Sequence, residues 1–122
     1  MAKILVIEDE PDVRNLYASV LQQNSFQVDT AEDGEQGLNK IRNGGYNLIL
    51  LDVMLPKMDA ITVLRELSKQ GPKNPNGPIV LLTNLSQEPI FKEADKLGAK
   101  YVILKTSVNP DQLVEKVKQM VV

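Results

Sequence analysis

The sequence predicts an α/β fold, a doubly wound five-stranded parallel sheet with five helices. Five short apolar runs alternate with five segments whose apolar residues recur at helical spacing, which is typical of a parallel sheet with helical crossovers. The runs around Leu50 and Leu81 are apolar throughout, as in strands covered on both faces. A chain of 122 residues can bury one sizeable core, so we expect a single domain over residues 1–122.

The first half of the chain predicts two strands and two helices. A strand at Lys3–Ile7 is closed by acids, and Pro11 then opens a helix over Asp12–Asn24. Five apolar side chains of this helix are expected to face the sheet: Val13, Leu16, Tyr17, Val20 and Leu21. The segment Phe26–Thr30 alternates apolar and polar residues, as edge strands do. A short helix over Asp33–Asn43 follows and ends at a pair of glycines.

Two strongly apolar strands form the predicted centre of the sheet. The first is Asn47–Asp52, and a third helix that ends at Gln70 follows it. A polar surface loop leads to the second, Pro78–Thr83. Ser86 is expected to cap a fourth helix that runs to Leu97. Both central strands therefore end in a side chain that can do chemistry.

The last strand is predicted at Tyr101–Leu104, directly before Lys105, and Asn109 and Pro110 are expected to cap and open the last helix. The strand order 2-1-3-4-5 suits this chain, because it puts the alternating second strand at an edge. In that order the winding reverses between strands one and three. The ligand crevice is then expected between the carboxyl ends of those two strands.

Composition excludes several classes of function. The chain has neither Cys nor His, which removes thiolate and imidazole metal ligands, cysteine nucleophiles and serine-type triads. The net charge of −2 favours neither nucleic acid nor an anionic membrane as a direct partner. The apolar run at the amino terminus is too short for a signal peptide, so we expect a cytoplasmic protein.

Functional side chains end several of the predicted strands. Glu8 and Asp9 follow the first strand, and Asp52, Thr83 and Lys105 mark the ends of the third, fourth and fifth. Three adjacent carboxylates would repel one another unless a cation is present, and an oxygen-rich set suits Mg²⁺. A carboxylate beside Mg²⁺ and an ammonium can attack phosphorus. Taken singly, each residue also has a structural explanation, as a helix-dipole acid, a β-former or a solvated charge.

The sequence resembles the receiver domains of two-component response regulators over essentially its whole length, and in particular a chemotaxis-type, stand-alone receiver. The resemblance rests on these segments: Glu8-Asp9, Leu50–Pro56, Met58-Asp59, Leu82-Thr83 and Lys105. It implies that Asp52 accepts a phosphoryl group from a sensor kinase's phosphohistidine. Thr83 and Lys105 would then bind the phosphoryl oxygens.

The same resemblance implies a Mg²⁺ cofactor. Asp9, Asp52 and the backbone carbonyl of Met54 would ligate the ion, with Glu8 acting through water. The phosphoryl donor must be another molecule, a histidine kinase or phosphotransfer protein, because this chain has no His. The fourth helix, fifth strand and fifth helix would form the surface for a downstream protein. We expect a monomer or weak homodimer.

The chain departs from the family pattern at several positions. Glu8 stands where Asp is usual and is one methylene longer, and Asn84 replaces a common Ala. The place of the family's mobile aromatic is Val102, with Tyr101 one residue earlier, on the other face of a strand. Thr106 follows the lysine where Pro is usual.

Two other functions are open from the sequence. One is an aspartyl-phosphate hydrolase similar to the haloacid dehalogenases, which also use Asp, Thr and Lys at strand ends. Those enzymes carry a second Asp two residues after the nucleophile, where this chain has Met54. The other is a degenerate receiver that binds partners without phosphorylation, or the receiver of a longer regulator.

Overall fold

The computed structural model describes residues 1–84 and 88–122 and places five strands in one parallel sheet of order β2-β1-β3-β4-β5. The strands are β1 (Lys3–Ile7), β2 (Gln27–Ala31), β3 (Leu48–Asp52), β4 (Ile79–Thr83) and β5 (Tyr101–Leu104). The predicted fold class and strand order are confirmed, with the alternating strand at one edge. Asp52 pairs with Leu82, and Thr83 with Leu104, so the functional strand ends meet at one edge of the sheet.

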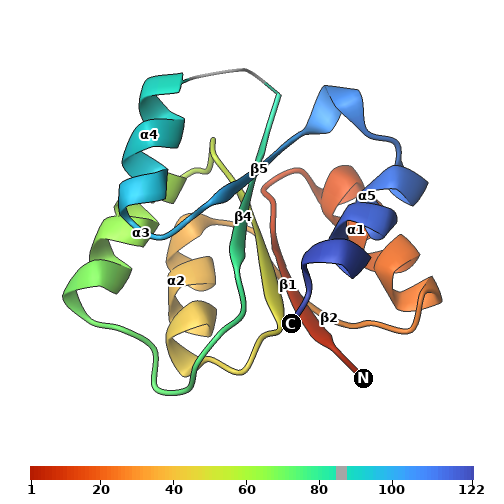
Figure 1. Ribbon diagram of the computed structural model, residues 1–122, viewed down its shortest axis with the longest axis horizontal. Coiled ribbons are helices and arrows are strands. Elements are labelled where there is room, and N and C mark those ends of the chain that lie inside the picture. The colour runs from red at the N-terminus through yellow and green to blue at the C-terminus, as the bar shows by residue number, and fades with distance from the viewer. Residues whose placement is uncertain (85–87) are drawn as a thin grey trace.

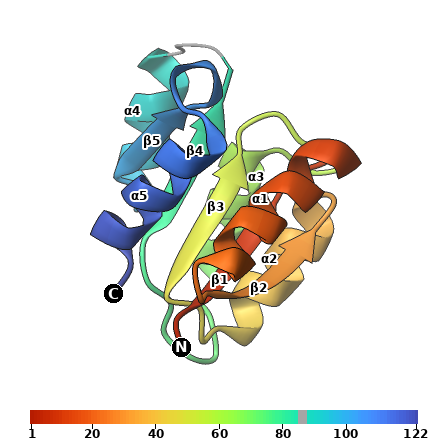
Figure 2. The same ribbon diagram turned by 90° about the vertical axis from the view of Figure 1, so that its right-hand side faces the viewer.

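Helices cover both faces of the sheet. They are α1 (Pro11–Gln23), α2 (Gly34–Asn43), α3 (Ala60–Lys69), α4 (Glu88–Lys96) and α5 (Pro110–Met120), and a 3₁₀ turn spans Lys105–Ser107. As Figure 1 and Figure 2 show, α1 and α5 lie on one face, and α2, α3 and α4 on the other. The predicted cap Ser86 lies outside the described residues. Among the described residues, no helix has both the length and the hydropathy to cross a membrane.

The core has two parts, one on each face of the sheet. On β3, Ile49 and Leu51 pack toward α2, α3 and α4, whereas Leu48 and Leu50 pack toward α1 and α5. All four side chains are fully buried. Burying one such side chain contributes roughly 1.5–3 kcal/mol, so β3 is held from both faces. The rigid strand in turn fixes the position of Asp52 at its end.

Side chains cap three of the helices at their amino ends. Asp33 accepts a hydrogen bond from the Gln36 amide at 2.8 Å, and Asp59 accepts one from the Thr62 amide at 2.9 Å. Asn109 forms a reciprocal capping box that begins α5, as predicted. The residue before α1, Glu10, makes no such side-chain bond. The turn between β1 and α1 therefore depends on other contacts.

One predicted core residue of α1 is wrong: Leu16 is 46% exposed. Tyr17 and Leu21 are the buried residues of this helix, and Val13 and Val20 are partly buried beside them. Each residue turns the helix by about 100°, so Leu16 lies roughly a quarter turn away from Tyr17. The apolar stripe of α1 is wider than the face that packs on the sheet.

Candidate functional site

Three carboxylates meet at the carboxyl edge of the sheet. Glu8 and Asp9 follow β1 and Asp52 ends β3, and each offers an oxygen within 4.8 Å of the other two. Glu8 and Asp52 are buried, whereas Asp9 is exposed. The parallel register produces this cluster, because β1 and β3 are neighbours and end together. The predicted convergence of these three acids is confirmed.

Lys105 bridges two of these acids from the end of β5. Its Nζ donates to Asp52 Oδ2 at 2.8 Å and also to Glu8 Oε1. The lysine side chain is only 13% exposed, so the interpretation of Lys105 as a solvated charge is wrong. It lies 97 residues after Glu8 and 53 after Asp52 in the sequence.

The cluster shifts the pKa values of its members. Burial, followed by the neighbouring Asp52, raises the pKa of Glu8 from 4.5 to about 8, while Lys105 acts in the opposite direction. For Lys105, burial is the largest influence and lowers the pKa, but the bonds and charges of Asp52 and Glu8 together raise it above its ordinary value. Burial is the largest cause of the raised pKa of Glu8, and the proximity of the Asp52 carboxylate adds to it.

Glu8→Gln is expected to stabilise the metal-free domain. The pKa of Glu8 is higher in the folded than in the unfolded state, so the folded state loses stability as pH rises from 4.5 to about 8. The gain should be roughly 1–2 kcal/mol at pH 8 and smaller at pH 5. Urea unfolding in EDTA at both pH values measures it. A variant less stable than the wild type at pH 8 would contradict this expectation.

A cavity of about 220 Å³ opens beside the cluster. Its lining residues are Asp9, Glu10, Asp52, Met54, Thr83, Asn84 and Lys105. Thr83 is buried at the end of β4, and the exposed Met54 donates its backbone N–H to Asp52 Oδ1 at 3.2 Å. The cavity thus offers carboxylates, a hydroxyl and an ammonium to one small ligand.

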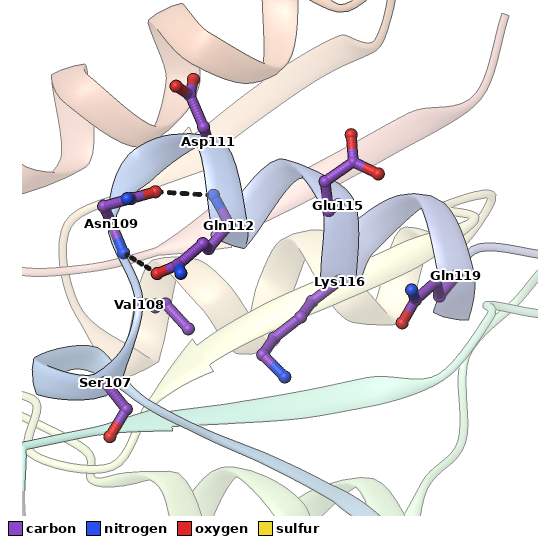
Figure 3. Close-up of a pocket in the computed structure, with 8 residues that line it drawn as sticks. All are labelled: Ser107, Val108, Asn109, Asp111, Gln112, Glu115, Lys116 and Gln119. Atoms are coloured by element: carbon purple, nitrogen blue, oxygen red, sulfur yellow. Dashed lines mark hydrogen bonds between the residues drawn. The ribbon is translucent and has the colours of Figure 1, made fainter.

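A larger hollow of about 480 Å³ lies along α5, away from the acids. There Asn109 and Gln112 bond to each other, and the acidic side chains of Asp111 and Glu115 point away from that of Lys116 (Figure 3). No group of like ligands converges there. Asp9, Asp52 and Lys105 instead line the smaller cavity.

The residues of the acidic cluster fit a hard divalent cation. If all three carboxylates are ionised, as in a metal-bound cluster, the ammonium of Lys105 leaves two of their negative charges uncompensated. Glu8 Oε2 is buried and has no hydrogen-bond partner among the described residues. An all-oxygen donor set with an unpaired buried oxygen suits Mg²⁺.

Arg14 also belongs to this region, and the sequence analysis missed it. Its Nη1 donates to the backbone carbonyl of Glu8 at 2.8 Å and to that of Asp9 at 3.3 Å. The available signal was electrostatic, because a cation near the amino end of a helix is disfavoured by the helix dipole. Such a residue needs a local partner, which here is the acid-bearing turn.

The fold and the site together define a flavodoxin-like α/β domain with an acidic, lysine-bridged cavity at its topological switch point. The family model of the response regulator receiver domain matches residues 4–118. The chain belongs to the response regulator receiver family, and it is a receiver domain of two-component signalling.

Relatives with curated descriptions are longer than this chain. The transcriptional regulatory protein DltR of Streptococcus agalactiae is 34% identical over 116 residues, which are 95% of this chain and 50% of that protein. ResD of Bacillus subtilis is 32% identical over 118 residues, 97% of this chain and 47% of that protein. The chain therefore spans about half the length of these relatives.

Solved structures match the whole chain. TrrA of Thermotoga maritima, crystallised in complex with Mg²⁺-BeF, is 36% identical with a TM-score of 0.81, and the match covers 99% of this chain and 100% of that one. A CheY-like receiver of Methanospirillum hungatei is 28% identical with a TM-score of 0.84, covering 98% and 92%. These matches favour the receiver function over the aspartyl-phosphate hydrolase and over the degenerate receiver.

Proposed function

We propose that Asp52 is the phospho-acceptor of this receiver and that the transfer requires Mg²⁺. One observation carries the proposal. Of the three clustered carboxylates, Asp52 alone both lines the cavity and accepts a hydrogen bond from Lys105. Glu8 bonds to Lys105 but does not line the cavity, and Asp9 lines the cavity without a bond to Lys105.

The proposed reaction is the transfer of a phosphoryl group from a phosphohistidine of another protein. An Asp52 carboxylate oxygen attacks phosphorus, the new P–O bond forms as the P–N bond breaks, and the electron pair leaves with the imidazole. Lys105 pairs with the negative phosphoryl oxygens, and the Thr83 hydroxyl donates to one of them. Little else is needed beyond positioning and neutralisation of charge.

The proposed metal ligands are Asp9, Asp52 and the backbone carbonyl of Met54, with Glu8 acting through water. Bound Mg²⁺ would neutralise the oxygens of the incoming phosphoryl group. The complex of TrrA with Mg²⁺-BeF supports a magnesium site in this family member as well. The convergence of three carboxylates, one of which has a buried oxygen without a hydrogen-bond partner among the described residues, supports it independently.

The proposed partners are a histidine kinase or phosphotransfer protein as donor and a downstream protein on the face of α4, β5 and α5. On β5, Tyr101 is 49% and Val102 is 38% exposed, so this edge offers apolar surface. Lys116 and Gln119, which line the α5 hollow in Figure 3, also line a smaller hollow together with Tyr101 and Val102. Four further properties stay predictions. They are a cytoplasmic location, a monomer or weak homodimer, no direct contact with nucleic acid, and a chemotaxis-type, stand-alone organisation.

The test is phosphorylation by acetyl phosphate with Mg²⁺, followed by intact-mass measurement. The wild-type chain should gain one phosphoryl group, and Asp52→Asn should gain none. Asp111→Asn, a matched loss of an exposed carboxylate on α5, should behave as the wild type. Equal labelling of Asp52→Asn, or no labelling of the wild type, would refute the proposed acceptor.

A further inference from the structure

The turn between β1 and α1 places two consecutive acidic side chains, Glu8 and Asp9, in the same cluster. Successive side chains of a strand point to opposite faces. Glu8 and Asp9 are successive, yet each places a carboxylate oxygen within 4.8 Å of the other and of Asp52. Both residues lie beyond the last residue of β1, Ile7, and the chain bends at Asp9, so the metal-ligand set depends on the conformation of this turn.

Backbone hydrogen bonds flank this turn on both sides, and on the helix side the Arg14 amide donates to the Glu10 carbonyl at 2.9 Å. On its β1 side, the Glu8 amide donates to the Ala31 carbonyl of β2 at 3.1 Å. On its helix side, Glu10 provides no side-chain cap for α1, unlike the residues that precede α2, α3 and α5. Arg14 contacts the turn in a different way, because its Nη1 donates to the two consecutive carbonyls of Glu8 and Asp9. These bonds orient both peptide planes at the turn itself.

Charge alone does not explain a guanidinium at this position. A cation beside the amino end of α1 is disfavoured by the helix dipole, and a cation beside a Mg²⁺ site repels the ion. Arg14 is not among the ion pairs found for the described residues, so its bonds go to backbone oxygens rather than to the carboxylates. Its contribution to the site is therefore geometric.

We propose that Arg14 is a positioning residue for the Mg²⁺ site, which orients the Glu8 and Asp9 carboxylates through their backbone carbonyls. The inference rests on the proposed function, because it assumes that these acids hold Mg²⁺. It assigns a role to a side chain that touches neither the ion nor the phosphoryl group. If Arg14 acted only through its charge, removing it would raise the Mg²⁺ affinity. If Arg14 positions the acids, removing it lowers the Mg²⁺ affinity, so the role is testable.

The experiment is calorimetric titration of Mg²⁺ into the wild type, Arg14→Met, Arg14→Lys and Arg42→Met. Positioning predicts a loss of roughly 10- to 100-fold in Mg²⁺ affinity for Arg14→Met, as is typical for groups that orient metal ligands. Arg14→Lys keeps a donor for the same carbonyls and should lose less. Arg42→Met removes an equal charge from α2, where Arg42 pairs with Glu66, and should bind Mg²⁺ as the wild type does.

The outcomes separate the inference from the proposed function. Unchanged or tighter binding by Arg14→Met overturns the positioning role, and so does an equal loss in Arg42→Met. A wild type that binds no Mg²⁺ overturns the metal site itself and the inference with it. Phosphorylation by acetyl phosphate gives a second readout: Arg14→Met should need more Mg²⁺ for half-maximal rate and keep its rate at saturation. Circular dichroism melts confirm that each variant is folded.

Discussion

Replacing Gly34 by alanine is expected to destabilise the domain by about 3 kcal/mol or more. Gly34 opens α2, and a Cβ there would lie 1.7 Å from the backbone oxygen of Met58 and 2.6 Å from its carbonyl carbon. A backbone atom yields less readily than the end of a flexible side chain. The loop between β3 and α3 would have to move away from α2, and urea unfolding measures the loss.

Gly71→Ala is the matched control for this prediction. Gly71 follows α3, and an added Cβ would meet no atom within 4 Å. This change should leave stability unaltered or raise it by about 0.4–1 kcal/mol through the unfolded state. Equal stability of the two variants would contradict the predicted clash. Because the displaced loop also carries Met54, Gly34→Ala should in addition weaken Mg²⁺ binding.

Mg²⁺ affinity is expected to rise steeply with pH and to level off near pH 8. Burial and Asp52 raise the pKa of Glu8 to about 8, so below that pH the carboxyl holds a proton that Mg²⁺ must displace. The affinity should therefore change by up to roughly tenfold per pH unit below 8. Titrations between pH 6 and 9, in buffers of different ionisation enthalpy, measure both affinity and proton release.

Glu8→Gln provides the control for this pH dependence. Glutamine has the shape of glutamate without its titration, so the steep rise should flatten in this variant. Asp111→Asn, on the far side of α5, should keep the wild-type profile. A wild-type affinity that is constant from pH 6 to 8 would show that Glu8 is already ionised in the metal-free domain.

The layered fold was predictable because its strands carry strong signals. The unbroken apolar run before Asp52 identified a strand covered on both faces, and the alternating run at Phe26–Thr30 identified an edge strand. The prediction that Leu16 faces the sheet was wrong, because an apolar residue at helical spacing need not lie on the part of the helix that contacts the sheet. At the other edge of the sheet, β5 leaves Tyr101 and Val102 exposed.

The site was predictable as a set of residues but not as a geometry. Parallel strands end at one edge, so Glu8, Asp52, Thr83 and Lys105 were expected to meet there, and they do. The sequence could not show that Lys105 bridges two acids, because side-chain directions depend on packing. Arg14 was not predicted because its partners are backbone carbonyls. Every residue has one, so the sequence does not show which carbonyls Arg14 contacts.

The sequence separation of 97 between Glu8 and Lys105 has a consequence for protein synthesis. A nascent chain in which β5 and Lys105 have not yet been synthesised carries Asp52, Glu8 and Asp9 but lacks the ammonium that pairs with Glu8 and Asp52. Such a chain holds mutually repelling carboxylates at the end of an incomplete sheet, so it should neither settle into its final form nor accept a phosphoryl group. We therefore expect competence to accept a phosphoryl group to depend on completion of the last strand, which brings Lys105 to Glu8 and Asp52.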